Sequence, residues 1–67
     1  MDAKLREIAR RYTTISAQQQ VDRFLDDGNP EGALEYLTHL FNVAWDSDEE
    51  ADEAVLNRFW DELKVLQ

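Results

Sequence analysis

The sequence predicts an all-α protein, a small bundle of three to four helices packed around a helix at residues 30–45. Apolar residues recur at the three- and four-residue intervals of amphipathic helices, and helix start and stop residues separate these stretches. The chain of 67 residues also has the length of one small domain. We expect the helices near residues 2–12, 16–27, 30–45 and 48–66, within a single domain over residues 1–67.

The stretch from Pro30 to Trp45 has the widest apolar surface of the chain. On a helix that turns about 100° per residue, its apolar residues cover roughly 200° of the circumference. A helix on one side of a core needs a stripe of little more than 100°. Such a helix must be covered on two sides, by other helices of the chain or by a partner. Its apolar residues are Ala33, Leu34, Tyr36, Leu37, Leu40, Phe41, Val43, Ala44 and Trp45.

The first 27 residues contain two apolar sets that do not align. In one straight helix, the set at residues 17–25 would lie about 180° from the set at residues 5–12. We therefore place a break near Thr13 and Thr14, where β-branched residues lower helix propensity. Ser16 and Gln19 form a capping box for the second helix. The alternative is one long helix over residues 2–27 whose first face serves a second subunit. The two sets are Leu5, Ile8, Ala9 and Tyr12, then Ala17, Val21, Phe24 and Leu25.

Gly28, Asn29 and Pro30 predict a tight turn between the second and third helices. Glycine favours the position just after a helix, asparagine the N-cap and proline the first helical turn. So short a connection joins antiparallel helices. The stretch from Gly28 to Ala44 also resembles the turn and second helix of a tetratricopeptide-type unit, which implies the same hairpin. No second copy of the unit exists, so we infer no peptide binding from it. The resemblance rests on Gly28, Ala33, Leu34 and Tyr36.

A second capping box, Ser47 with Glu50, is expected to begin the last helix. The acids around it lie at the positive end of the helix dipole. The apolar stripe of this helix is about 140° wide. Val65 falls outside the stripe, and we expect its side chain to be exposed or in a contact. The stripe consists of Val55, Leu56, Phe59, Trp60, Leu63 and Leu66.

The formal net charge of −8 is unevenly distributed along the chain. Residues 1–23 contain five basic and three acidic residues, whereas residues 24–67 contain two basic and twelve acidic ones. One interpretation is that the basic first helix lies over acidic helices of its own fold and partly neutralises them. The other is that a negative face is offered to a basic partner.

The sequence offers no catalytic constellation. It has no cysteine, and it lacks a phosphate loop, a nucleophile elbow and a helical metal pair. The acidic run at residues 46–53 fails as an EF-hand loop, because Ala51 and Asn57 replace the required glycine and glutamate. His39 lies one turn from Glu35 on the polar side of its helix, without a nucleophile or an orienting partner. We expect no enzyme, no catalytic residue, no cofactor and no metal.

Direct nucleic-acid binding and membrane insertion are also disfavoured. A domain with a pI of about 4.3 would be repelled by a polyanion. No apolar run approaches the roughly 20 residues needed to cross a bilayer, and the N-terminus is not expected to be a signal peptide. We expect a cytoplasmic protein.

The leading hypothesis is a non-enzymatic protein–protein interaction module, a small adaptor or inhibitor that self-associates as a homodimer. It rests on apolar residues in excess of what one small bundle should cover. The predicted partner-binding residues are Leu5, Ile8, Tyr12, Tyr36, Val43 and Trp60.

The alternative is an acidic mimic of nucleic acid that blocks a basic DNA- or RNA-binding protein, as short phage-type inhibitors do. Its binding should weaken steeply with ionic strength, whereas an apolar contact should barely respond. The carboxylates would come from residues 61–62 and from an acidic face formed by Asp46, Asp48, Glu49, Glu50, Asp52 and Glu53.

Overall fold

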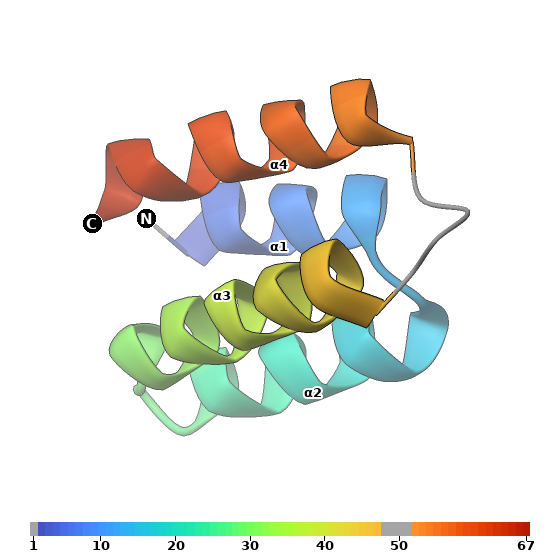
Figure 1. Ribbon diagram of the computed structural model, residues 1–67. Coiled ribbons are helices and arrows are strands. Elements are labelled where there is room, and N and C mark those ends of the chain that lie inside the picture. Colours follow the sequence, from blue (N-terminus) through green and yellow to red (C-terminus); the bar gives the residue numbers. More distant parts are fainter. Residues whose placement is uncertain (1, 48–51) are drawn as a thin grey trace.

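The computed structural model describes residues 2–47 and 52–67. This part of the chain contains four helices. They are α1 (Asp2–Tyr12), α2 (Ile15–Asp26), α3 (Pro30–Ser47) and α4 (Glu53–Leu66), and no strand occurs within these residues. Consecutive helices run in opposite directions, so that α1 begins and α4 ends on the same side of the bundle (Figure 1). The predicted all-α class is confirmed, and residues 2–27 form two helices rather than one.

The bundle has two central and two outer helices. α1 and α3 each contact the other three helices, whereas α2 and α4 do not contact each other within the described residues. The prediction that the bundle packs around the 30–45 helix is therefore confirmed, and α1 shares that central position. The core consists of Leu5, Ile8, Ala9, Val21, Leu25, Ala33, Leu37, Phe59 and Leu63.

A break at Thr13 and Thr14 separates α1 from α2, as predicted. Thr14 has an extended backbone (φ −79°, ψ 167°), and its hydroxyl accepts a hydrogen bond of 3.2 Å from the amide of Ala17. A capping oxygen binds an amide two or three residues into the helix, so Thr14 is the N-cap. The predicted capping box of Ser16 and Gln19 is wrong, because Ser16 already lies in the first turn of α2.

The reversal of the chain at this break turns both apolar sets of residues 2–27 toward one core. Leu5 and Ile8 on α1 and Val21 on α2 are each 0 % exposed. The prediction that Leu5 and Ile8 form an outer face for a partner is therefore wrong. That prediction came from the opposite directions of the two apolar sets, which would arise only if residues 2–27 formed one straight helix.

In the turn between α2 and α3, Gly28, Asn29 and Pro30 each have the role predicted from the sequence. Gly28 has a φ of 73°, a conformation that glycine adopts without strain. The Asn29 side chain accepts a hydrogen bond of 3.0 Å from the amide of Gly32, and Pro30 is the first residue of α3. The antiparallel hairpin expected from these residues is present.

The connection between α3 and α4 differs from the prediction. Ser47 is the last residue of α3, and the N-cap of α4 is Asp52, whose carboxylate accepts a hydrogen bond of 2.9 Å from an amide of the first turn. The capping box of Ser47 and Glu50 is therefore wrong at Ser47. Glu50 and the predicted helix start at residues 48–51 lie outside the described residues. Serine and aspartate both favour the N-cap, so local preference did not separate the candidates.

Three of the four basic residues of α1 pair with carboxylates on α2 or α4. This confirms the interpretation in which the first helix partly neutralises acidic helices of its own fold. The pairs on these exposed or partly buried side chains are Lys4–Glu62 at 2.9 Å, Arg11–Glu62 at 3.3 Å, Arg6–Asp22 at 3.5 Å and Arg6–Asp26 at 3.3 Å.

The bundle covers its own core to the extent usual for a monomer of its size. Its accessible surface is 4638 Å², against about 4,400 Å² expected for a compact protein of the same mass. The total accessible surface is therefore close to that of a compact monomer. Among the four helices described, none combines the length and the apolar character needed to cross a membrane.

Thr14→Ala should lower the free energy of unfolding by about 1 kcal/mol, because the Ala17 amide loses its capping oxygen. Ser16→Ala is the matched control, and it should change stability by at most about 0.5 kcal/mol, since alanine is the better helix former at an exposed helical position. Urea unfolding followed by circular dichroism measures both. A larger loss for Ser16→Ala than for Thr14→Ala would return the N-cap to Ser16.

Candidate interaction surface

Large apolar side chains that remain exposed gather at one end of the bundle. Because the helices alternate in direction, α1 and α3 end where α2 and α4 begin, on the right-hand side of Figure 1. Ile15, Val43, Trp45 and Val55 belong to these segments, with exposed fractions of 72, 47, 49 and 40 %. In the described part of the chain the fifth such residue is Val65, which is 75 % exposed near the other end of α4. Its predicted exposure is confirmed.

An apolar pocket of about 190 Å³ opens at the same end. Two features leave this space open: α2 and α4 do not contact each other, and the lining includes the small side chains of Ala17 and Ala44. All four helices or their ends contribute to its lining, which consists of Tyr12, Thr13, Thr14, Ala17, Leu40, Ala44, Leu56 and Phe59.

None of the four exposed side chains lines the pocket, but each residue is the chain neighbour of one that does, and we call these four residues the rim. Ile15 follows Thr14, Val43 and Trp45 flank Ala44, and Val55 precedes Leu56. We call the pocket and these four rim residues the apolar end.

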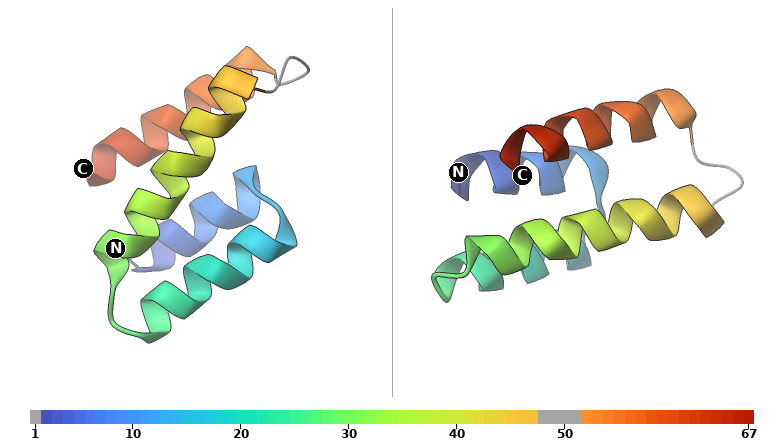
Figure 2. Two further views of the ribbon diagram at one scale, coloured as in Figure 1. Left: turned by 60° about the horizontal axis from the view of Figure 1, so that its bottom comes forward. Right: turned by 60° about the vertical axis from the view of Figure 1, so that its left-hand side comes forward.

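The side chain of Trp45 is exposed because α3 is longer than the helices that pack against it. α3 has 18 residues, against 12 in α2, which corresponds to about 27 Å against about 18 Å of helix. The tight turn at Gly28 sets the start of α3 level with the end of α2, so the excess length falls at the other end. Figure 2 shows the last turn of α3 and the first turn of α4 extending past the α1–α2 pair. The wide apolar arc of α3 is therefore covered along most of its length and uncovered in its last turn.

Phe41 connects the exposed Trp45 to the core through aromatic contacts. Its ring centroid lies 5.9 Å from that of Trp45, 5.3 Å from that of Trp60 and 5.7 Å from that of Phe59. Phe59 in turn stacks on Tyr12 at 5.1 Å. Trp45 is thus held on one side by a packed aromatic cluster while the remainder of its ring meets water.

The predicted partner-binding residues fall into three groups. Val43 is exposed at the rim, and Tyr12 lines the pocket as a half-buried wall. Tyr36 and Trp60 are also half-buried, but Tyr36 packs against Phe24 and Trp60 against Phe41. Leu5 and Ile8 are in the core. The sequence reasoning missed Ile15, Trp45 and Val55, although the greater length of the third apolar stretch was a signal for Trp45.

The electrostatic balance at the end of α3 differs from that of the other helices. α1, α2 and α4 each have a basic residue in the last turn, where the dipole is negative, but α3 has none. Its last turn contains the exposed Asp46 instead, and Asp52 and Glu53 are exposed where α4 begins. This edge of the apolar end is therefore acidic.

The acidic face expected for a nucleic-acid mimic is only partly available. Asp46, Asp52 and Glu53 are exposed, and Asp48, Glu49 and Glu50 lie outside the described residues. The further carboxylates at residues 61–62 are engaged within the fold. Asp61 pairs with Lys64 at 3.2 Å, and Glu62 pairs with α1.

Glu62 links α4 to α1 beside the Tyr12 wall of the pocket. Its Oε1 accepts hydrogen bonds from Lys4 Nζ at 2.9 Å and from Arg11 Nη1 at 3.3 Å. The second carboxylate oxygen of Glu62, Oε2, is buried and has no hydrogen-bond partner among the described residues. Interaction with the Tyr12 hydroxyl, and then with Lys4, lowers the pKa of the Glu62 carboxyl, whereas the pKa of Tyr12 is raised by the carboxylate beside it.

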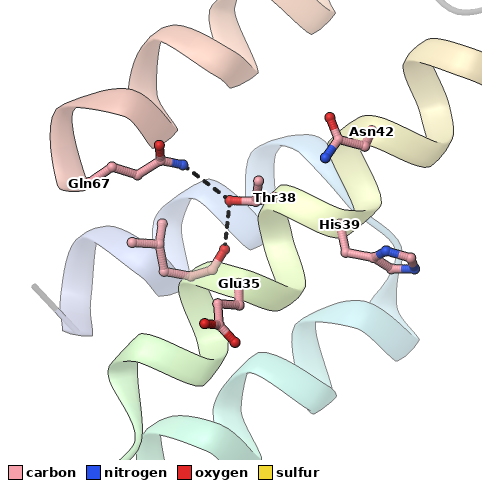
Figure 3. Close-up of a pocket in the computed structure, with 6 residues that line it drawn as sticks. Glu35, Thr38, His39, Asn42 and Gln67 are labelled. Atoms are coloured by element: carbon pink, nitrogen blue, oxygen red, sulfur yellow. Dashed lines mark hydrogen bonds between the residues drawn. The ribbon is translucent and has the colours of Figure 1, made fainter.

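A shallow polar depression of about 350 Å³ lies elsewhere, between α3 and the end of α4 (Figure 3). Thr38 donates a hydrogen bond of 2.9 Å to the Leu34 carbonyl and accepts one of 3.3 Å from the Gln67 amide. His39 and Glu35 point away from each other in this view. The arrangement therefore contains no hydrogen-bonded base and nucleophile. Among the described residues, no group of three or more histidines and carboxylates is placed to hold a metal ion.

No family model matches this chain, and neither does any of the curated proteins or solved structures with which it was compared. Inference about function therefore depends on the site itself.

Glu62→Gln should lower the free energy of unfolding by about 1 kcal/mol near neutral pH, because Lys4 and Arg11 lose a charged acceptor. A carboxyl whose pKa is lowered by folding adds stability above its unfolded pKa, near 4.5. That stability is lost as the pH falls through the folded value. Urea unfolding across a pH series should therefore show the two proteins converging below pH 4.5.

Asp61→Asn is the control for this experiment, because its ion pair with Lys64 is solvent-exposed and such pairs contribute little. It should leave stability nearly unchanged at every pH. A difference between wild type and Glu62→Gln that stays constant from neutral to strongly acidic pH would contradict the role assigned to Glu62.

Proposed function

We propose that this protein is a non-enzymatic protein–protein interaction module whose partner docks on the apolar end. The observation that carries the proposal is the grouping of exposed side chains. Of the five large apolar residues exposed in the described part of the chain, four belong to the end of the bundle where one apolar pocket opens. Solvent-exposed apolar groups around a concave site are typical of protein-interaction surfaces.

Trp45 has the properties of a binding anchor. Tryptophan is enriched among residues that dominate binding energy, especially beside pockets that exclude water. Its stacking on Phe41 restricts the ring before a partner arrives, so less conformational entropy is lost on binding. Val43 and Val55 add apolar area that a partner can remove from water.

The small size of the surface fits an adaptor or an inhibitor that binds a segment of another protein. Self-association through the same surface is the narrower form of this proposal. In that form, light scattering would show a mass that rises with concentration and that returns to the monomer value when Val43 is replaced.

Val43→Ser and Val65→Ser form a matched pair for testing the surface, since both replace an exposed valine in the last turns of a helix. Partners captured by the wild-type protein are first identified by mass spectrometry, and their affinities are then measured with purified components. Val43→Ser should weaken binding by about tenfold, the equivalent of about 1.4 kcal/mol, and Trp45→Ser should weaken it further. Val65→Ser should leave the affinity unchanged.

Circular dichroism and urea unfolding should give nearly wild-type values for both valine variants, because substitutions at exposed positions change stability little. Equal affinities for Val43→Ser and Val65→Ser would remove the apolar end as the docking surface.

A further inference from the structure

We propose that the occupant of the apolar end is a basic amphipathic segment of a partner protein. One large apolar side chain of the segment enters the pocket, and a lysine or arginine lies beside the acidic end of α3. This inference rests on the proposed function and adds the chemistry of the partner to it.

The size of the pocket fits one large side chain. A cavity of about 150 Å³ lined by leucine, isoleucine and phenylalanine accommodates benzene, and the pocket here measures about 190 Å³. A leucine or phenylalanine side chain therefore fits, whereas a second one does not. The occupant is a single anchor on an extended or helical segment.

The chemistry of the lining selects an apolar anchor. The Thr13 hydroxyl donates to the Ala9 carbonyl, and the Thr14 hydroxyl accepts from the Ala17 amide, so both threonines are already engaged by the backbone. The Tyr12 hydroxyl lies beside the Glu62 carboxylate. The remaining lining is aliphatic or aromatic. A polar side chain entering the pocket would lose hydrogen bonds to water without gaining equivalent ones.

The charge of the rim selects a basic flank. The last turn of α3 has no basic residue and contains the exposed Asp46, which adds to the negative end of the helix dipole. A cation near the end of α3 would therefore be attracted by a carboxylate and by the negative end of the helix dipole. Cations near the face of a tryptophan are also attracted by its π system, and the half-exposed Trp45 belongs to the same part of α3.

The charged residues at this end of the bundle are also unevenly distributed. α1 ends with Arg10 and Arg11 on its side of the pocket, whereas Asp46, Asp52 and Glu53 lie where α3 ends and α4 begins. A bound segment therefore places its basic residues over α3 and α4 and its neutral or acidic residues over α1.

A second copy of the chain is a poorer occupant. A two-fold symmetric contact joins the same patch on both subunits, so the acidic edges of two chains would enter one interface. Each chain also has a formal net charge of −8, and like charges across an interface oppose association. A basic segment meets neither obstacle.

The test uses three synthetic helical peptides of equal length as probes. The first has a leucine and phenylalanine face with lysine and arginine elsewhere, the second has glutamate in place of the basic residues, and the third has serine in place of the apolar face. Titration of the isotope-labelled full chain, followed by amide chemical shifts, gives the affinity and the location of binding.

The first peptide should bind at least about tenfold more tightly than either of the others. Its chemical shift changes should centre on the amides of Thr14, Ala17 and Ala44. Its affinity should fall as salt is raised, because exposed charges are screened.

Substitutions at Asp46 and Ala44 separate the contribution of charge from that of the apolar anchor. Asp46→Asn should weaken the basic peptide severalfold and reduce its salt dependence, whereas Asp27→Asn, which makes the same charge change at the opposite end of the bundle, should not. Ala44→Leu, which fills the pocket, should weaken the peptide at both low and high salt.

The inference would be overturned if the basic and acidic peptides bound equally, or if Asp46→Asn and Asp27→Asn had the same effect. It would also be overturned if sedimentation showed a second copy of the chain occupying the surface. In each of these cases the proposed function survives if binding of the captured partner still depends on Val43 and not on Val65. If replacing Val43 does not change the affinity of the captured partner, both the proposed function and this inference are contradicted.

Discussion

The reversal of the chain at Thr13 and Thr14 is the constraint on which the rest of the structure depends. If residues 2–27 formed one straight helix, Leu5 and Ile8 would face away from Val21 and Leu25, and no single core could hold both sets. The break lets α1 fold back on α2, so that all these side chains enter one core. It also brings the basic residues of α1 between the carboxylates of α2 and α4. Packing and charge neutralisation thus follow from the same two residues.

The apolar end follows from a difference in helix length. α1 and α2 are short because of the break, whereas α3 continues to Ser47. Its last turn therefore has too few neighbours to cover Val43 and Trp45. Since α2 and α4 do not meet, the same end also contains a pocket between them. The features that support an interaction surface are consequences of one short hairpin packed against a longer one.

Local signals in the sequence were sufficient for some features and insufficient for others. The turn at Gly28, Asn29 and Pro30 was predictable because each residue has a distinct local preference there. The N-caps at Thr14 and Asp52 were not, because neighbouring serines have the same preference and only the packed structure selects among them. A helical wheel gives the direction of a side chain but not the length of the neighbouring helices. It therefore identified Val43 but not Trp45, and it wrongly placed Leu5 and Ile8 on the outside.

The two walls of the pocket that belong to α2 and α4 have no contact with each other, and this separation has a consequence for selectivity. Among the described residues, α4 reaches the rest of the bundle only through α1 and α3, so the width of the cleft is set by how α4 packs on these two helices. The size of the side chain that fits the cleft therefore depends on the position of α4. Under the proposed function, the anchoring side chain that a partner can use would then depend on contacts outside the cleft, such as the ion pairs of Glu62 with α1.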